Sequence, residues 1–257
     1  MLTFRNTNIL FLIVLVSVIG YNVNHSISFF CYLVLFIAYS SILFYGSYYI
    51  GSSFYLKIIC FAKTTKKEIA ISFDDGPAKE YTPDILTILK QYNVETAFFC
   101  IGKNITGNEE ILREIISAGH IIGNHSYSHH PLFDLFSSKK MLADIRMTDA
   151  AVEKVTGLVP RLFRPPYGVT NPNLCKAIIK GNYIPIGWNV RSMDTVAKDR
   201  QKLLNRVTQL VRPGAIVLFH DTCKITKDIL PDFIKQVKND GYEIVRLDKM
   251  LNLNAYA

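Results

Sequence analysis

The chain has 257 residues and a net charge of +8, yet Arg5 is the only charged side chain among the first 56 residues. No dense run of lysine and arginine is interleaved with aromatic residues, which argues against nucleic-acid binding, and five scattered cysteines without a C-x-x-C pair argue against a disulfide framework. Because the other charges lie from Lys57 onward, the sequence indicates a membrane-embedded N-terminal part and one water-soluble domain.

Residues 1–62 are predicted to form a membrane anchor with one or two transmembrane helices, at about residues 9–23 and 27–50. The second apolar segment is long enough to cross about 30 Å of hydrocarbon as a helix, whereas the first is marginal. The first can also be interpreted as the core of a signal peptide behind Arg5, but no small-residue cleavage site follows it. We therefore favour a helical hairpin that turns at Asn22–Ser26.

Basic residues at the ends of the two segments predict the orientation of the anchor. Arg5 precedes the first segment, the turn has no lysine or arginine, and four lysines follow the second segment, namely Lys57, Lys63, Lys66 and Lys67. The positive-inside tendency then places both chain ends and the soluble domain on the cytoplasmic side of a bacterial-type inner membrane. This orientation reverses only if the first segment alone spans the membrane.

Residues 63–257 alternate between short apolar runs and helix signals, which predicts an α/β fold. The strand candidates are Glu68–Phe73, Thr96–Ile101, Ile121–Asn124, Arg161–Arg164, Ile184–Val190, Ala215–His220 and Glu243–Leu247. Strands that alternate with helices form a parallel sheet, and closure into a (β/α) barrel fits this pattern. In such barrels the functional residues gather at the carboxyl ends of the strands.

Two helices between these strands have clear start signals. Thr82 and Pro83 are predicted to occupy the N-cap and the first helical position of one helix. Asn171 and Pro172 are predicted to do the same for a later one.

Two adjacent carboxylates end the first predicted strand, in the run Ser72-Phe73-Asp74-Asp75-Gly76-Pro77. They repel each other and cannot both face an apolar core, and Gly-Pro then turns the chain away. One carboxylate is suited to bind a metal ion while its neighbour acts as a base. Taken alone, the motif would favour an acidic turn with a capping aspartate.

A histidine pair follows the third predicted strand. His125 and His129 are four residues apart, so one helical or tight-loop turn brings both rings to the same side. Together with Asp75 they offer two imidazoles and one carboxylate, which is typical of catalytic zinc sites that keep a position open for water. A histidine pair alone is more often a surface or core feature.

Two further strands end in residues suited to hydrolysis. Arg164 precedes two prolines that hold the backbone extended, so that the N–H of Tyr167 can serve as an oxyanion donor and Arg164 can pair with the base carboxylate. The alternative is a proline-rich turn with a surface arginine. His220 ends an apolar strand and is a candidate general acid.

Four motifs in this order resemble the polysaccharide deacetylase family, which has the NodB homology domain and is also called carbohydrate esterase family 4. The motifs are Asp74-Asp75, His125-x-x-x-His129, Arg164-x-Pro166-Tyr167-Gly168 and Leu218-x-His220, and the resemblance extends from about Glu68 to Leu247. It implies a distorted barrel of about seven strands and a divalent metal ion, usually zinc.

The resemblance also implies a role for each motif residue. The metal ligands would be Asp75, His125 and His129. The other roles would fall to Asp74 as general base, Arg164 as its partner, His220 as general acid, the backbone of Tyr167 as part of the oxyanion hole, and Leu218 as the wall for the acetyl methyl group.

One family motif departs from its usual form, in which a Trp-x-Val lead precedes two aspartates three residues apart and a second tryptophan. Trp188 begins the lead and is predicted to contact substrate, and Asp194 matches the second aspartate, which orients the catalytic histidine. Arg191 replaces the first aspartate and Thr195 replaces the second tryptophan. These two replacements leave the shape of the acetyl pocket undetermined, whereas the metal ligands are unaffected.

The sequence thus predicts a hydrolase that removes N-acetyl groups from amino sugars, with acetate and a free amine as products. A cytoplasmic domain at the membrane lipid favours a lipid-linked sugar as substrate, whereas an outward domain favours peptidoglycan or another surface polymer. The same site could serve a sugar O-deacetylase or a deformylase. An inactive glycan-binding membrane protein is disfavoured, because every expected polar catalytic position except Arg191 holds a competent residue.

Overall fold

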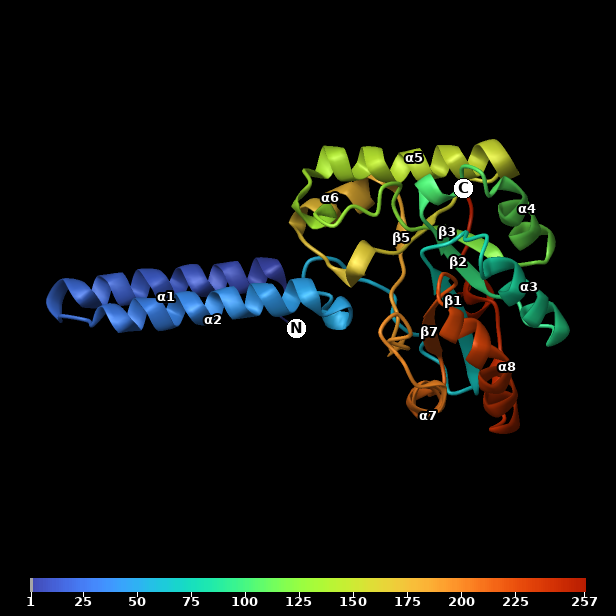
Figure 1. Cartoon of the computed structure of the whole chain (residues 1–257). Helices are drawn as coiled ribbons and strands as arrows, with labels where there is room; N and C mark the ends of the chain where they lie inside the picture. The colour runs from blue at the N-terminus through green and yellow to red at the C-terminus, as the bar shows by residue number, and fades with distance from the viewer. Residues whose placement is uncertain (1) are drawn as a thin grey trace.

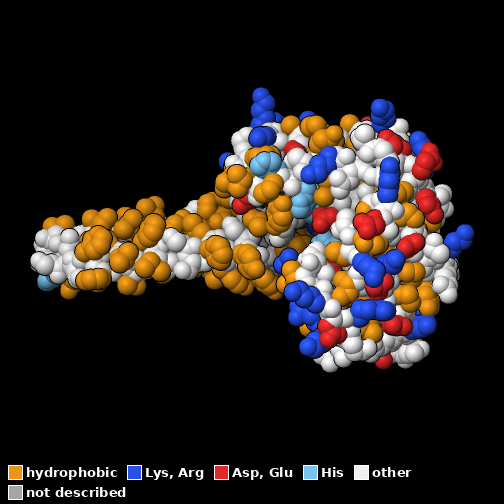
Figure 2. All heavy atoms as spheres, in the orientation of Figure 1, with side chains coloured by type: hydrophobic (Ala, Val, Ile, Leu, Met, Phe, Trp, Pro, Cys, Tyr) orange, Lys and Arg blue, Asp and Glu red, His pale blue; other side chains and the backbone are white. Residues whose placement is uncertain are grey.

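The computed structural model describes residues 2–257, in which a helical hairpin projects from an α/β domain (Figure 1). Helices α1 (Phe4–Asn24) and α2 (Phe29–Tyr48) lie side by side, and both are long and apolar enough to cross a membrane. Figure 2 shows apolar side chains over the hairpin and charged side chains on the globular part. The two predicted apolar helices are confirmed, and they indicate a membrane anchor or a signal segment.

The turn of the hairpin lies slightly later than predicted. Helix α1 continues through Asn24, so the chain reverses over residues 25–28 instead of Asn22–Ser26. The Asn22 side chain still closes this turn, because its Oδ1 accepts a hydrogen bond from the Ile27 N–H at 2.7 Å.

The strands of the domain form one parallel sheet in the order β5-β4-β3-β2-β1-β7-β6, and β8 pairs with the start of β1. Their bounds are β1 Glu68–Asp74, β2 Ala97–Cys100, β3 Ile121–Asn124, β4 Leu162–Phe163, β5 Ile184–Pro185, β6 Val190–Arg191, β7 Ala215–His220 and β8 Glu243–Ile244. The predicted α/β fold is confirmed as a seven-strand parallel half-barrel, with β5 and β6 at its two open edges.

Helices cover the outer face of this half-barrel (Figure 1). They are α3 Thr82–Gln91, α4 Glu109–Ser117, α5 Ser138–Thr156, α6 Pro172–Gly181, α7 Arg200–Leu210 and α8 Lys224–Asn239. The short helix α9 Leu247–Leu251 packs with Ala70 and Phe99 on the other face of the sheet. Short 3₁₀ turns lie at Ile50–Ser52, Gly102–Asn104, Phe133–Leu135 and Pro166–Gly168.

The central strand β1 is buried on both faces, as is typical of parallel sheets. Ile71 and Phe73 belong to one apolar cluster with Phe233 of α8, whereas Ala70 from the opposite face belongs to a second cluster. Because the strand cannot shift without exposing one of these clusters, the polar residues that end it are held in place.

The predicted strand Ile184–Val190 is wrong as a single element. Its two ends belong to β5 and β6, which lie at opposite edges of the sheet, and the residues between them cross the open side. The linker, which is the segment between the hairpin and β1, pairs with these residues through its backbone. The Ile59 N–H donates to the Pro185 carbonyl at 3.0 Å, and the Gly187 N–H donates to the Ile59 carbonyl at 2.8 Å. The linker therefore fills the gap that the strands leave.

The end of α2 is attached to the loop that follows β4. Thr170 is buried, its N–H donates to the Ser47 carbonyl at 3.0 Å, and its hydroxyl donates to the Gly46 carbonyl at 3.2 Å. A methyl group on Gly46 would overlap the Phe54 ring, and the Phe4 N–H donates to the Phe54 carbonyl at 3.0 Å. The hairpin is thus in direct contact with the loop that carries the Arg-Pro-Pro-Tyr motif.

One of the two predicted helix starts is confirmed. Asn171 caps α6, with its side chain accepting a hydrogen bond from the Leu174 N–H at 2.8 Å. The prediction that Thr82 is the N-cap of α3 is wrong, because Tyr81 holds that position. The Thr82 hydroxyl instead donates to Asp221 Oδ2 at 2.6 Å, so the side chain that was expected to cap the helix is bonded to a residue far away in the sequence.

Gly214, at the start of β7, tests whether the linker packs as described. Its φ is +78°, and a methyl group there would overlap the Ala62 carbonyl oxygen, whereas Gly157, with a φ of +73°, has open space at that point. We expect Gly157→Ala to cost about 1–2 kcal/mol of backbone strain, and Gly214→Ala to lower the unfolding midpoint in detergent micelles by at least about 3 °C more. Equal midpoints would contradict the packing of the linker on β7.

Candidate active site

Three metal-ligating side chains converge where β1 and β3 end. Single donor atoms of Asp75, His125 and His129 lie within 4.8 Å of one another, and the Nε2 atoms of the two histidines lie 3.6 and 3.5 Å from Asp75 Oδ1. This buried oxygen has no hydrogen-bond partner within residues 2–257. A buried carboxylate oxygen that lacks a donor and faces two imidazole nitrogens fits a divalent cation.

The backbone turns sharply at these ligands. Asp75, Ser126 and His129 have φ values of 77°, 62° and 43°, which are uncommon for residues with a side chain. Side chains hold the histidine loop in this shape, since Asn124 Oδ1 accepts from the Ser126 N–H at 2.8 Å and Ser126 Oγ accepts from the His129 N–H at 3.1 Å. The histidine pair therefore converges through a tight loop and not through a helix.

The electrostatics of the histidines suit metal binding. Burial lowers the pKa of His125 to about 3, and burial also lowers the pKa of His129, so both rings are neutral at pH 7. His125 Nδ1 lies 2.9 Å from the Arg164 carbonyl oxygen. When Nδ1 carries the proton it donates to this carbonyl, which leaves Nε2 free to bind the cation.

Asp74 lies beside the triad and is paired with a buried arginine. Its Oδ2 is 3.8 Å from His125 Nε2, and Arg164 Nη1 donates to its Oδ1 at 2.6 Å and to Ser72 Oγ at 2.8 Å. Burial raises the pKa of Asp74, and the charge and hydrogen bond of Arg164 partly offset this effect. A carboxylate that is oriented by an arginine and faces the metal site can act as a base.

His220 lies on the other flank and is held by Asp194. Its Nδ1 is 2.7 Å from Asp194 Oδ1, its backbone N–H donates to Asp194 Oδ2 at 2.7 Å, and its Nε2 lies 4.0 Å from Asp75 Oδ2. Burial lowers the pKa of His220, but the hydrogen bond and charge of Asp194, together with the charges of Asp74 and Asp75, raise this pKa to about 9. The ring is therefore protonated at neutral pH and can serve as an acid.

These groups line a cleft of about 210 Å³. Its polar floor and its walls comprise Asp74, Asp75, His125, His129, His220, Pro165, Tyr167, Trp188, Arg191, Thr195 and Leu218. Tyr167 has a φ of 58°, and its half-exposed ring packs on His129 with the ring centres 4.6 Å apart. The fold therefore brings the predicted site residues to this cleft, with Arg164 and Asp194 directly behind it.

Three supporting residues are not found by sequence reasoning. The Thr226 hydroxyl donates to Asp194 Oδ2 at 2.6 Å, the Ser72 hydroxyl accepts from Arg164, and Asp144 Oδ1 accepts the backbone N–H of Tyr127 at 2.8 Å. Ser72 stands in the first motif and could have been suspected from its position. Thr226 and Asp144 lie in helices without any local signal.

A half-barrel that gathers a metal-ligating triad between an arginine-paired carboxylate and an aspartate-paired histidine is typical of metal-dependent hydrolases. Within this class the sequence is specific: residues 61–184 match the family model described as Polysaccharide deacetylase, and the chain belongs to this family. It is thus a polysaccharide N-deacetylase, a hydrolase that acts on carbon–nitrogen bonds other than peptide bonds. The resemblance inferred from the four motifs is confirmed.

The relatives include cell-wall enzymes of known name. The chain is 34% identical over 189 residues to the peptidoglycan-N-acetylglucosamine deacetylase of Bacillus cereus. This alignment covers 72% of this chain and 68% of that protein. It is also 34% identical over 203 residues to the peptidoglycan-N-acetylglucosamine deacetylase PgdA of Listeria monocytogenes, which covers 79% of this chain. The chain spans only 42% of the length of PgdA.

Solved structures agree with the family and the fold. The crystal structure of the Bc1960 peptidoglycan N-acetylglucosamine deacetylase aligns with a TM-score of 0.74 and 31% identity, over 78% of this chain and 95% of that one. The structure of a pseudoenzyme of carbohydrate esterase family 4 from Bacillus anthracis aligns with a TM-score of 0.70 and 30% identity, over 75% of this chain and 68% of that one.

Asp194→Asn tests the origin of the acidic histidine. Asp194 raises the pKa of His220 above its ordinary value, so the protonated ring persists up to about pH 9 and is lost above it. Without the carboxylate charge we expect this pKa to fall, and the alkaline limb of the pH–rate profile to move down by about one unit or more.

Thr226→Val is the matched control, because it removes one hydrogen bond from Asp194 and keeps the charge. This variant should not move the alkaline limb downward. An unchanged limb in Asp194→Asn would show that another group supplies the proton.

Proposed function

We propose that this protein is a zinc-dependent N-deacetylase of an N-acetylglucosamine residue in a bacterial cell-wall glycan. The observation that carries the proposal is the Asp75, His125 and His129 triad, flanked by Asp74 and His220. Two imidazoles and one carboxylate are a donor set that zinc prefers in catalytic sites. The names of the two relatives described above, which are peptidoglycan-N-acetylglucosamine deacetylases, support the choice of sugar, whereas two other relatives from Bacillus subtilis are named peptidoglycan-N-acetylmuramic acid deacetylases.

The protein groups supply base, oxyanion donor and acid. Asp75, His125 and His129 would hold a divalent cation, which would polarise the acetyl carbonyl and acidify water when bound. Asp74, oriented by Arg164, accepts a proton from the attacking water. The Tyr167 N–H donates to the carbonyl oxygen as negative charge develops on it, and one such donor is commonly worth about 3–4 kcal/mol. His220 Nε2 delivers a proton to the departing nitrogen.

The protonated state of His220 supports an amide as the bond that is cleaved. An amine leaves only when it is protonated, and the pKa of about 9 that Asp194 gives His220 keeps that proton available at neutral pH. Leu218 is buried at the wall of the cleft, where it can contact the acetyl methyl group, and Trp188 offers an aromatic face to the sugar.

Asp74→Asn tests whether Asp74 is needed for catalysis but not for binding the metal ion. We expect this variant to keep about one zinc ion per chain, since the three ligands are intact, and to lose at least about 10²-fold in the release of acetate from chitotetraose. His129→Ala is the contrasting variant, and it should lose both zinc and activity. Zinc content by elemental analysis and acetate release are the measurements. Near-normal activity in Asp74→Asn would refute its role as the base.

We further propose that the hairpin anchors the catalytic domain on the cytoplasmic side of the membrane. Arg5 and Lys57 lie close in sequence to the end of the hairpin that meets the domain, Lys63, Lys66 and Lys67 follow before β1, and the opposite turn has no lysine or arginine. On this side of the membrane the substrate would be a glycan precursor and not the finished wall polymer.

Protease accessibility tests this orientation. In spheroplasts that express the full chain, added protease should leave the domain intact, and it should degrade the domain once the membrane is permeabilised. Degradation in intact spheroplasts would place the domain outside and would make the assembled polymer the substrate.

A further inference from the structure

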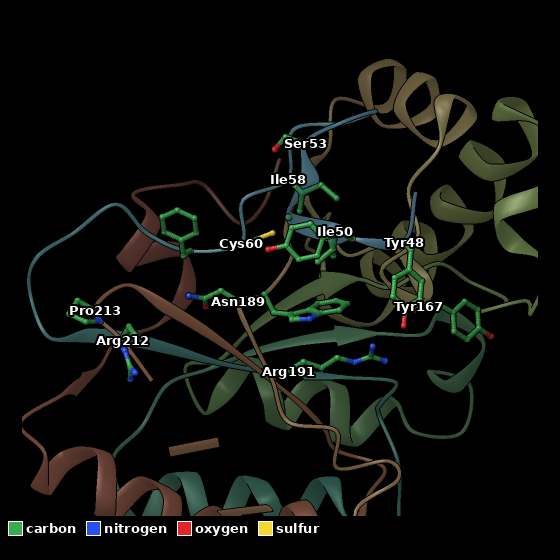
Figure 3. Close-up of a pocket in the computed structure, with 14 residues that line it drawn as sticks. Tyr48, Ile50, Ser53, Ile58, Cys60, Tyr167, Asn189, Arg191, Arg212 and Pro213 are labelled. Atoms are coloured by element: carbon green, nitrogen blue, oxygen red, sulfur yellow. The ribbon is translucent and has the colours of Figure 1, made fainter. Parts of the chain in front are cut away.

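A second cavity, of about 620 Å³, adjoins the catalytic cleft (Figure 3). Tyr167, Trp188 and Arg191 line both cavities, so that they share a wall. Tyr48 and Ile50, at the end of α2, line the second cavity from the opposite side. A molecule that enters the catalytic cleft from this direction must therefore pass between the hairpin and the domain.

The charge of the second cavity is opposite to that of the catalytic cleft. Its only charged lining residues are Arg191 and Arg212, and no acidic side chain lines it. Within residues 2–257 the arginines that form ion pairs are Arg113, Arg164 and Arg246, so neither of the two lining arginines is neutralised. The Arg212 guanidinium donates to the Gln209 and Val211 carbonyls at 2.8 and 2.6 Å, which leaves Arg191 as the guanidinium available to an anionic ligand. Guanidinium suits phosphate in particular.

Arg191 is the better placed of the two arginines. In Figure 3 it extends toward Tyr48 and Tyr167, whereas Arg212 lies beside Pro213 at the other side of the cavity. Arg191 pairs in register with Leu218, which lines the catalytic cleft. It also holds the position at which the resemblance to the family expects an aspartate, so a negative charge is exchanged for a positive one at the boundary of the two cavities.

The second cavity lies at the depth of the lipid headgroups if the hairpin spans the membrane. Tyr48 and Tyr49 are exposed at the end of α2, and tyrosines at helix ends are typical of the membrane–water interface. The hydrogen bonds from Thr170 to the Gly46 and Ser47 carbonyls hold the catalytic loop against this helix end. In a hairpin that spans the membrane, the mouth of the site therefore lies close to the membrane surface, where lipid phosphates lie.

We propose that the second cavity binds the phosphate of a lipid-linked amino sugar. Arg191 holds the phosphate at the membrane surface, the lipid chain extends along the apolar wall of Ile50 and Ile58 toward the bilayer, and the N-acetyl group of the sugar reaches the metal cleft. This inference rests on the proposed N-deacetylase function and names the form in which that enzyme receives its sugar.

The test compares two lipid probes that differ only in the phosphate, together with two soluble sugars. The full chain in lipid nanodiscs is given N-acetylglucosamine joined to farnesol through a diphosphate, the same sugar joined to farnesol without phosphate, UDP-N-acetylglucosamine, or chitotetraose, and acetate release is measured. We expect kcat/KM for the lipid diphosphate probe to exceed that for the phosphate-free lipid by about tenfold or more, mainly through a lower KM.

Arg191→Gln should reduce this preference to less than about threefold, because the guanidinium that contacts the phosphate is lost. Arg206→Gln is the matched control, because Arg206 is an exposed arginine of α7 that lines neither cavity, and it should keep the wild-type preference.

Three results would overturn the inference. They are equal kcat/KM for the two lipid probes, equal losses on both lipid probes in Arg191→Gln, and turnover of UDP-N-acetylglucosamine as efficient as that of the lipid diphosphate, which would mean a soluble sugar phosphate. Binding of farnesyl diphosphate alone separates the two proposals. If it depends on Arg191 while no probe is deacetylated, the phosphate site stands and the proposed function fails.

Discussion

Arg164 has no exposed surface, so the folded chain must supply all the hydrogen bonds that water would give its guanidinium. One nitrogen, Nη1, donates to Asp74 and Ser72, while Nη2 donates to the Gly187 carbonyl at 3.0 Å and Nε to the Ile186 carbonyl at 3.4 Å. Those two carbonyls belong to the segment that crosses the open side of the half-barrel. The buried Arg164 guanidinium therefore both holds this crossing segment against the sheet and orients Asp74. Removing the guanidinium would leave Asp74 as an uncompensated buried charge.

One ion pair lies on each side of the metal ligands, and the residue that faces the cleft is the anion in one pair and the cation in the other. Arg164 supports a carboxylate on one flank, and Asp194 supports an imidazolium on the other. Burial alone would push Asp74 and His220 toward their neutral forms, and it is the partner of each that determines what the group can do at neutral pH. Two titratable groups whose environments differ in this way are suited to act as base and acid in one reaction.

The hairpin is more than a tether. The residues that follow it fill the gap between β5 and β6, and the end of α2 accepts hydrogen bonds from the loop that carries Tyr167. The position of the domain relative to the hairpin and the shape of the catalytic mouth therefore depend on the same contacts. Arg191, which departs from the family motif, lies at this junction, so the departure concerns what approaches the site and leaves the metal ligands unchanged.

The sequence by itself determined the apolar helices, the parallel α/β class and the identity of the metal triad, because each depends on composition, periodicity or residues that directly follow a strand. Only the tertiary structure decided that residues 184–190 are divided between two edges of the sheet, that Thr82 donates to Asp221 instead of capping α3, and that Thr226 supports Asp194. It also decided that Arg191 faces a cavity shared with the hairpin. These features join segments that are far apart in the chain, and local patterns carry no information on which distant group will become the partner of a buried polar atom.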